Sequence, residues 1–455
     1  MRDNDLRNKK VVVVGLGTSG VDMCSLLSEL GAIVFCTESA DNEAIRENAR
    51  KLENRYIEIE IGAHTENFLK GCNLVCVSPG VSKDALPFKY ALMNDIPLIG
   101  EIELGFTYCK APIVAITGTN GKSTVTSLVG DLLKDGGKKV RVCGNIGNSL
   151  SGEVTRVTKD MICVVEVSSF QLEWIVDFRP AVSCILNITD NHLERYNDFD
   201  DYAMTKLKIF SNQIEGDIAV LNFDDKYLKK LPKPSRFKKI FYSRVEEIEG
   251  IFFKDGEVFY RDKNAANKIF KMPPTKLKGN HNIENILASI IIAMTQGIEP
   301  SSIEATLRKF KPLSHRIESL GEINGIEFLD DSKATSIDAT KRVLETMDLQ
   351  SVILIAGGRD KGGNYDAIKE EIKSKVKKLI LVGEAAPIIE KYFKGLIEIE
   401  KADNLEEAAR GALKSAKKGE KVLLSPMCSS FDMFRDYKHR GDVFRQAFEG
   451  LKSKS

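Results

Sequence analysis

The sequence has no excess of charge of one sign. Its 455 residues contain 66 Lys and Arg against 65 Asp and Glu, which leaves a formal net charge of +1. A protein that binds mainly nucleic acid or an anionic membrane usually carries a basic excess, and the balance here supports neither partner. We therefore expect no nucleic acid and no membrane among its partners.

Paired cysteine motifs and long hydrophobic runs are also missing. The nine cysteines are an odd number without a Cys-x-x-Cys pair, and many lie inside apolar runs such as Ile162-Cys163-Val164. Reduced core thiols in a cytoplasmic protein are the simplest interpretation. The run Val11–Val14 breaks at Gly15 and is too short for a signal peptide or a membrane span.

The glycine-rich segment from Thr117 to Thr124 is the most informative part of the chain. It follows the apolar run Ala111–Ile116, which indicates a buried parallel strand, and precedes apolar residues at helical spacing. In such a unit, backbone N–H groups and the positive end of the helix face a phosphate. Lys122 then reaches the terminal phosphates and the Ser123 hydroxyl can bind Mg²⁺. The usual loop has a further glycine where Ile116 stands, so this loop is compressed. The segment predicts a nucleoside triphosphate site that contains Gly118, Thr119, Asn120, Gly121, Lys122, Ser123 and Thr124.

Strands and helices alternate along the chain, which predicts an α/β fold with parallel sheets covered on both faces. One core seldom grows beyond about 250–300 residues, so we expect three domains. They are an N-terminal Rossmann-like domain (1–102), a central P-loop ATPase-like domain with a mostly parallel sheet (103–311) and a C-terminal Rossmann-like domain (312–455). Lys311-Pro312 marks the second linker.

The glycines of the first domain leave more than one interpretation open. The segment Gly15–Gly20 follows a strand and precedes a helix, as in Rossmann-like diphosphate sites, and Glu38 is placed to hold a ribose hydroxyl. Alone, this segment favours an NAD-dependent dehydrogenase. Alternatively, the glycines are needed only for tight packing of the strand against the helix. A dehydrogenase gives no role to Lys122 or Glu166. A nucleotide-driven switch is a third hypothesis, but we find no guanine-reading Asn/Thr-Lys-x-Asp motif at a suitable strand end.

Further polar residues stand where predicted strands end or helices begin. Glu166 follows the strand Met161–Val165, and a carboxylate beside the loop strand is the geometry that holds Mg²⁺ against phosphates. Asn282 and Asn285 open a helix, where their amides could bind an adenine edge. An N-terminal cap explains Asn282 equally well.

Taken together, six segments resemble the Mur ligases, ATP-dependent enzymes that form amide bonds in peptidoglycan precursor synthesis. The resemblance covers essentially the whole chain in the right order, and the compressed loop is itself a feature of that superfamily. The segments are the phosphate loop, Glu166–Glu173, His281-Asn282, His315-Arg316, Asp331–Thr335 and Gly357–Gly362. Ser168–Glu173 and the segment from Ser425 to Asp432 are similar to the branch that adds D-glutamate to UDP-N-acetylmuramoyl-L-alanine.

The resemblance implies the chemistry and its cofactors. ATP would phosphorylate the alanine carboxylate, and the D-glutamate amine would displace phosphate from the acyl phosphate. The implied catalytic residues are Lys122, Glu166, His192 and Lys206. Ser123 and Glu166 would hold one Mg²⁺, while His192 and a carbamylated Lys206 would hold a second. The implied nucleotide contacts outside the loop are Asn282, Asn285, Arg316 and Asp331.

The resemblance also implies the substrate contacts. UDP would lie near Thr18, Ser19, Thr37 and Ser78, and the muramoyl-alanine portion near Asn145, Ser168 and Gln171. The amino-acid pocket would be lined by Lys333, Thr335, Lys361, Ser430 and Tyr437, with Lys361 pairing with the side-chain carboxylate. Three residues depart from the family pattern and put details of the second metal site and the pocket in doubt: Asn191, Glu194 and Tyr437. We expect a cytoplasmic monomer whose partners are UDP-N-acetylmuramoyl-L-alanine and D-glutamate.

Overall fold

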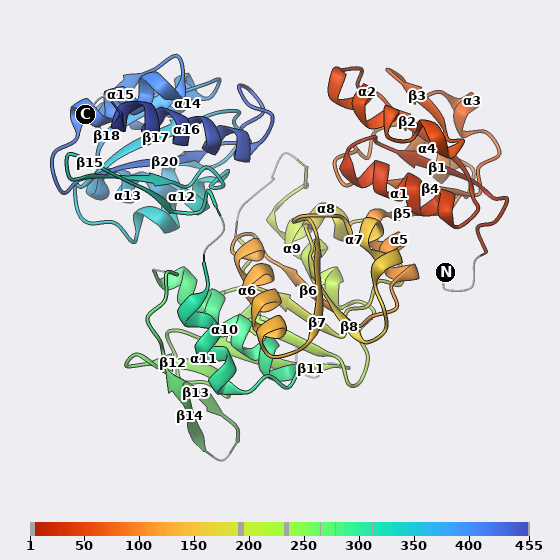
Figure 1. The fold of residues 1–455 in the computed structure, drawn as a ribbon, viewed down its shortest axis with the longest axis horizontal. Coiled ribbons are helices and arrows are strands. Elements are labelled where there is room, and N and C mark those ends of the chain that lie inside the picture. The colour runs from red at the N-terminus through yellow and green to blue at the C-terminus, as the bar shows by residue number, and fades with distance from the viewer. Residues whose placement is uncertain are drawn as a thin grey trace. The chain divides into compact units, whose positions relative to one another are not determined.

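The computed structural model describes residues 5–189, 195–231, 236–263, 265–277, 279–311 and 314–453 (Figure 1). Asn191, His192 and Glu194 lie outside these residues. The chain divides into two compact units. The first comprises Met1–Ile188, Ala203–Pro273 and Glu284–Leu307; the second comprises Thr189–Tyr202, Pro274–Ile283 and Arg308–Ser455. No helix among the described residues is both long and apolar enough to cross a membrane.

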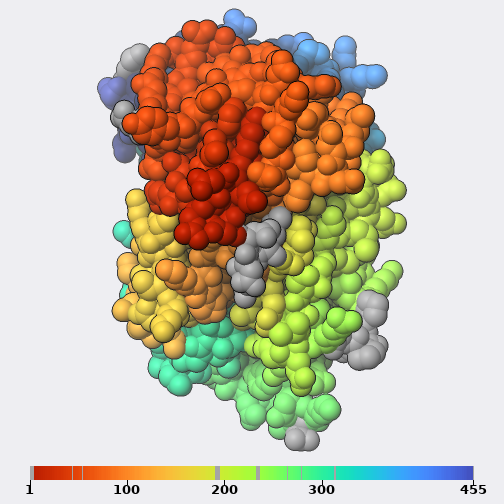
Figure 2. Space-filling model, turned by 90° about the vertical axis from the view of Figure 1, so that its right-hand side faces the viewer, coloured from red at the N-terminus to blue at the C-terminus, as the bar shows by residue number. Residues whose placement is uncertain are grey.

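The first domain has a five-stranded parallel sheet in the order β3-β2-β1-β4-β5, and its N-terminal part is the red surface of Figure 2. The valines of β1 are fully buried, as expected for a central strand covered on both faces. The strands are β1 (Lys10–Val14), β2 (Ile33–Glu38), β3 (Glu58–Ile61), β4 (Leu74–Val77) and β5 (Leu98–Gly100). The helices are α1 (Thr18–Glu29), α2 (Glu43–Arg50), α3 (Glu66–Leu69) and α4 (Leu86–Met93).

The central domain has a nine-stranded sheet in the order β14-β13-β12-β11-β10-β9-β6-β8-β7. All neighbours from β7 to β12 pair in parallel, and only β12, β13 and β14 form an antiparallel end. The strands are β6 (Ile113–Thr117), β7 (Lys139–Gly144), β8 (Met161–Glu166), β9 (Val182–Ile185), β10 (Ile218–Asn222), β11 (Lys238–Ser243), β12 (Gly250–Lys254), β13 (Glu257–Arg261) and β14 (Ala266–Lys271). The helices are α5 (Glu101–Tyr108), α6 (Lys122–Asp135), α7 (Leu150–Glu153), α8 (Ser169–Leu172), α9 (Phe199–Leu207), α10 (Asn280–Thr295) and α11 (Pro300–Lys309).

The third domain has a six-stranded sheet in the order β15-β16-β20-β17-β18-β19, parallel except for β15 against β16. Alternate residues of β17 enter two cores: Leu354 and Ala356 pack with α12 to α14, while Ile353 and Ile355 pack with α15 and α16. The strands are β15 (Glu318–Ile323), β16 (Ile326–Asp330), β17 (Val352–Gly357), β18 (Val376–Val382), β19 (Glu398–Lys401) and β20 (Lys421–Met427). The helices are α12 (Ile337–Leu344), α13 (Lys369–Lys375), α14 (Ala386–Phe393), α15 (Leu405–Ser415) and α16 (Tyr437–Lys452). The predicted three-domain α/β fold is confirmed.

Candidate active site

The loop between β6 and α6 has the backbone of a phosphate site. Gly118 has φ 149° and Gly121 has φ 85°, in the region that favours glycine. A Cβ atom on Gly121 would lie 2.4 Å from Oδ1 of Asn285, and one on Gly118 would lie 3.0 Å from Cβ of Leu186. Gly121 is the N-cap of α6, so the positive end of the helix opens on the loop. The structure thus brings the predicted nucleotide contact Asn285 against the phosphate loop.

Asn187, which belongs to none of the sequence motifs, braces this loop. The backbone O of Asn187 accepts from Thr119 N at 2.9 Å, and its side-chain Oδ1 accepts from Asn120 N at 2.8 Å. Its Nδ2 also donates to Asn120 O at 3.2 Å. Asn187 lies just beyond the end of β9, the strand that pairs with β6. Its position directly after an apolar run therefore indicates a residue at the ligand-binding edge of the sheet.

The side-chain nitrogens of two lysines converge on the loop. Nζ of Lys122 donates to the carbonyls of Gly118 and Thr119, both at 2.9 Å, and Nζ of Lys206 donates to Gly118 O at 3.0 Å. Lys206 is 2% exposed. Burial, assisted by the charge of Lys122, holds the pKa of Lys206 well below its ordinary value. The fold therefore favours the neutral amine of Lys206.

Glu166 has the environment of a cation ligand. The register of β6 and β8 pairs Ile116 with Glu166, which places this carboxylate beside the start of the loop. Its Oε1 accepts from Nδ2 of Asn145 at 2.8 Å, whereas its Oε2 is buried without a hydrogen-bond partner. A buried, unpartnered carboxylate oxygen is costly, and a hard cation satisfies it. Together with the buried Ser123 at the start of α6, Glu166 fits Mg²⁺.

The predicted muramoyl-alanine contacts lie at neighbouring strand ends. Asn145 follows β7, and its backbone N donates to Glu166 O at 2.8 Å. Ser168 and Gln171 form a capping box at α8: Ser168 N donates to Gln171 Oε1 at 2.9 Å, and Gln171 N donates to Ser168 Oγ at 3.3 Å. Gln171 is only 3% exposed, and its side-chain amide is engaged by Ser168 and Glu101.

The predicted UDP contacts of the first domain fall into two groups. Thr18 is exposed and Ser19 half-buried at the start of α1. Thr37 is fully buried and donates to Oε2 of Glu60 at 2.8 Å, and the largely buried Ser78 donates to Gly15 O at 3.2 Å. Thr37 and Ser78 therefore stabilise this domain from within.

Glu38, whose place at the end of β2 is compatible with a ribose contact, binds the glycine loop in this structure. Its Oε2 accepts from the backbone N of Leu16 at 2.9 Å, and its Oε1 accepts from the backbone N of Ala40 at 2.9 Å. Both carboxylate oxygens are therefore engaged within the domain.

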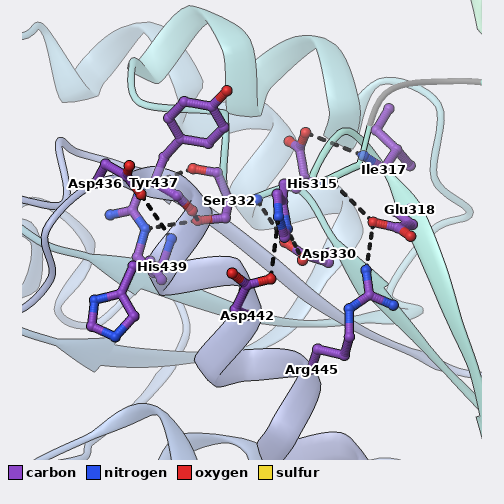
Figure 3. A network of polar contacts seen from close by, with 12 residues as sticks. His315, Ile317, Glu318, Asp330, Ser332, Asp436, Tyr437, His439, Asp442 and Arg445 are labelled. Carbon is purple, nitrogen blue, oxygen red and sulfur yellow. Dashed lines mark hydrogen bonds and ion pairs between the residues drawn. The ribbon is translucent and has the colours of Figure 1, made fainter. Parts of the chain in front are cut away.

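In the third domain, His315 is held by three acidic side chains (Figure 3). Its Nδ1 lies 2.7 Å from Oδ2 of Asp330, its Nε2 lies 3.6 Å from Oδ1 of Asp442, and its backbone N donates to Glu318 at 3.0 Å. The hydrogen bond with Asp330 is the main cause of a raised pKa of His315. His315 is thereby fixed immediately before Arg316, a predicted nucleotide contact.

The predicted nucleotide contact Asp331 is buried in the same region. Its carboxylate accepts from Ser425 Oγ at 2.9 Å and from Ile317 N at 3.3 Å. Burial raises the pKa of Asp331 to about 7, while the charge of Arg316 opposes that rise. A cation or a donor from a bound ligand would favour its ionised form.

The predicted amino-acid contacts form two groups. Thr335 and Lys361 line a pocket of about 370 Å³, together with Asp338, Lys341 and Arg342. Nζ of Lys333 lies 3.9 Å from the ring centroid of Tyr437, a cation–π contact, and Ser430 is buried. The pocket combines cationic and acidic side chains, which suits a ligand with both carboxylates and an amine.

Arg440, which belongs to none of the sequence motifs, organises the loops around this region. It is 1% exposed and donates to the carbonyls of Ser332 at 2.8 Å, Cys428 at 3.2 Å and Ser429 at 3.2 Å. Burial lowers the pKa of Arg440 to about 10, so it remains a cation near neutral pH. Arg440 stands four residues before the buried Phe444 on α16, a spacing that places both on the same buried face of the helix.

Three family models match the chain in succession. They are the "Mur ligase MurD-like, N-terminal domain" over residues 9–100, the "Mur ligase middle domain" over 116–293 and the "Mur ligase, glutamate ligase domain" over 315–428. The chain belongs to the Mur ligase family. This family catalyses ATP-dependent amide bond formation in peptidoglycan precursor synthesis, typically with Mg²⁺.

Relatives along the full length support the same assignment. This Mur ligase is 41% identical to a UDP-N-acetylmuramoylalanine--D-glutamate ligase of Thermoanaerobacter sp., over 98% of this chain and 100% of the relative. It is 39% identical to the enzyme of that name from Koribacter versatilis, over 97% of each chain.

Solved structures share the fold. MurC of Thermotoga maritima matches with a TM-score of 0.62 and 20% identity, over 97% of this chain and 100% of that chain. MurF of the same organism, in complex with ADP, matches with a TM-score of 0.60 and 18% identity, over 98% of this chain and 96% of that chain.

Proposed function

We propose that this Mur ligase joins D-glutamate to UDP-N-acetylmuramoyl-L-alanine and converts ATP to ADP and phosphate. The observation that carries the ATP chemistry is the compressed glycine loop with the buried, half-satisfied carboxylate of Glu166 beside it. The choice of D-glutamate is supported by the names of the full-length relatives and by the mixed charges of the pocket that contains Lys361.

In this mechanism, the alanine carboxylate attacks the γ-phosphorus of ATP and ADP leaves. The D-glutamate amine then attacks the acyl carbon, loses a proton and expels phosphate, which leaves the amide. Lys122 neutralises charge on the transferring group, and the N–H groups of the loop bind the phosphates. Ser123 and Glu166 would hold Mg²⁺, which supplies further charge neutralisation when bound. Arg316 and Asp331 would contact the nucleotide.

We further propose that Lys206 is carbamylated in the active enzyme. Its neutral Nζ attacks dissolved carbon dioxide, an N–C bond forms and one proton leaves, so that a buried amine becomes an anionic oxygen donor. The depressed pKa of Lys206 supports this step because only the neutral amine reacts. With His192, which lies outside the described residues, the carbamate would hold a second Mg²⁺.

For the substrates, we propose that the glycine loop and Thr18 and Ser19 hold UDP, with Thr37 and Ser78 shaping that site. Asn145, Ser168 and Gln171 would position the muramoyl-alanine portion, and Asn282 and Asn285 would contact the nucleotide base. The proposed amino-acid contacts are Lys333, Thr335, Lys361, Ser430 and Tyr437.

The decisive experiment measures phosphate release by the purified chain. We expect release only when ATP, Mg²⁺, UDP-N-acetylmuramoyl-L-alanine and D-glutamate are all present, and a product of the corresponding mass. Equal turnover with L-lysine or meso-diaminopimelate would place the chain in another branch of the family. Reduction of NAD by a 2-hydroxy acid would instead support the dehydrogenase hypothesis.

A further inference from the structure

Glu101 is a fully buried carboxylate that the mechanism above does not use. It is the first residue of α5 and is 0% exposed. Its Oε1 accepts from the backbone N of Ser151 at 2.8 Å, and its Oε2 accepts from Nε2 of Gln171 at 3.2 Å. Each oxygen of one side chain thus holds a different segment of the central domain.

Both segments belong to the proposed binding site for the muramoyl-alanine portion. Ser151 lies in the first turn of α7, directly after the loop that carries Asn145. Gln171 is the third residue of α8, whose N-cap is Ser168. These segments follow β7 and β8, and Glu101 is the shared acceptor that joins them.

Glu101 also fixes the orientation of the Gln171 amide. A carboxylate only accepts hydrogen bonds, so the NH₂ end of Gln171 must face it. The Oε1 end then faces Ser168, where it accepts from the backbone N at 2.9 Å and from Oγ at 3.1 Å. A reversed amide would present donors to the Ser168 N–H and lose this arrangement.

We propose that Glu101 is a positioning residue that sets the spacing and orientation of the Asn145 and Ser168 segments for the UDP-sugar substrate. This inference rests on the proposed function, because that function assigns these segments to the muramoyl-alanine portion. Glu101 touches no reacting atom. Its effect is on the affinity for one substrate of the three.

The test compares Glu101→Gln with the matched control Glu103→Gln. Glu103 lies on the same helix, is also fully buried and accepts from the backbone N of Val176, Asp177 and Phe178 at 2.8, 3.0 and 2.9 Å. We expect Glu101→Gln to raise the KM and the calorimetric Kd for UDP-N-acetylmuramoyl-L-alanine by about tenfold, the scale of one lost hydrogen bond. The KM for ATP should stay within about twofold of wild type.

The control should lower the Tm at least as much but leave every KM unchanged. Native affinity for the UDP-sugar in folded Glu101→Gln, or an equal loss of affinity in Glu103→Gln, would overturn the inference. A wild-type chain that releases no phosphate with D-glutamate would instead overturn the proposed function.

The exchange variant Glu101→Gln/Gln171→Glu covers the case in which Glu101→Gln does not fold. It keeps one amide and one carboxylate in the pair: the new amide donates to residue 171, and the new carboxylate accepts from Ser168 N. We expect the exchange to fold and to bind the UDP-sugar more tightly than Gln171→Glu alone, in which two buried carboxylates meet. Affinity no better than that of Gln171→Glu would show that the pair does not position the site.

Discussion

Lys122 and Lys206 donate to the same backbone carbonyl, that of Gly118, at 2.9 and 3.0 Å. If both groups were charged at this buried oxygen they would repel each other, and the repulsion is strong where water is excluded. Burial lowers the pKa of Lys206 first, and Lys122 adds to the effect. The neutral form of Lys206 is the one that the proposed carbamylation needs.

The first prediction concerns this lysine. Lys206→Ala should lose at least about a hundredfold in phosphate release, because an oxygen ligand of the proposed second Mg²⁺ disappears. Added acetate or formate should restore part of the activity by filling the vacated position. The control is Lys208→Ala, an exposed lysine two residues away, which should keep wild-type turnover. Full activity in Lys206→Ala would contradict the carbamate.

The second prediction separates catalysis from stability at Glu166. Glu166→Gln keeps an acceptor for Asn145 but removes a buried charge, so its Tm should equal or exceed that of wild type. Its turnover should fall by at least about a hundredfold through loss of the cation ligand. Differential scanning fluorimetry with ATP should show that Mg²⁺ raises the Tm of wild type, and that EDTA reverses this effect. The Glu166→Gln variant should show no Tm shift with Mg²⁺. An equal Tm shift in both proteins would show that Glu166 does not hold the metal.

The third prediction tests the brace of the phosphate loop. Asn187→Ala removes the side-chain bonds to the N–H and C=O of Asn120, so the loop should lose its fixed shape. We expect the KM for ATP to rise by about tenfold, with the KM for D-glutamate unchanged. Asn212→Ala is a suitable control because it too loses two side-chain hydrogen bonds to the backbone, those to the carbonyls of Val176 and Phe178. An equal effect on ATP in the control would show that the loss is not local.

The fourth prediction is a pH dependence with a definite sign. The hydrogen bond with Asp330 raises the pKa of His315 in the folded protein. Protonated His315 therefore contributes its full stability below the unfolded pKa of about 6.5, and this contribution is lost as pH rises through the folded pKa. The Tm difference between wild type and His315→Gln should therefore be larger at pH 6 than at pH 8.5.

His64 provides a control of opposite sign. Burial lowers the pKa of His64, so its neutral form is favoured in the folded state and it destabilises the protein as pH falls. The Tm difference between wild type and His64→Gln should shrink on acidification. If the two Tm differences changed with pH in the same direction, the assigned causes of the two pKa shifts, the Asp330 hydrogen bond and burial, would be refuted.

The sequence by itself determined the local units of the site. The order strand, glycine loop and helix around Lys122 follows from spacing and from glycine conformations, which act over a few residues, and the structure confirms the α/β fold that this alternation predicts. The position of Glu166 at a strand end was predictable for the same reason, because parallel strands end at one edge of a sheet.

Only the tertiary structure decided which polar groups are enclosed and what they contact. Asn187 meets the phosphate loop because β9 pairs with β6, and Arg440 is buried because α16 packs against the third sheet. The tertiary structure also decides that Thr37, which the family resemblance places near UDP, donates to Glu60 inside the first domain. The physical reason is that strand pairing and burial, set by contacts distant in sequence, fix the partner and the pKa of a polar side chain.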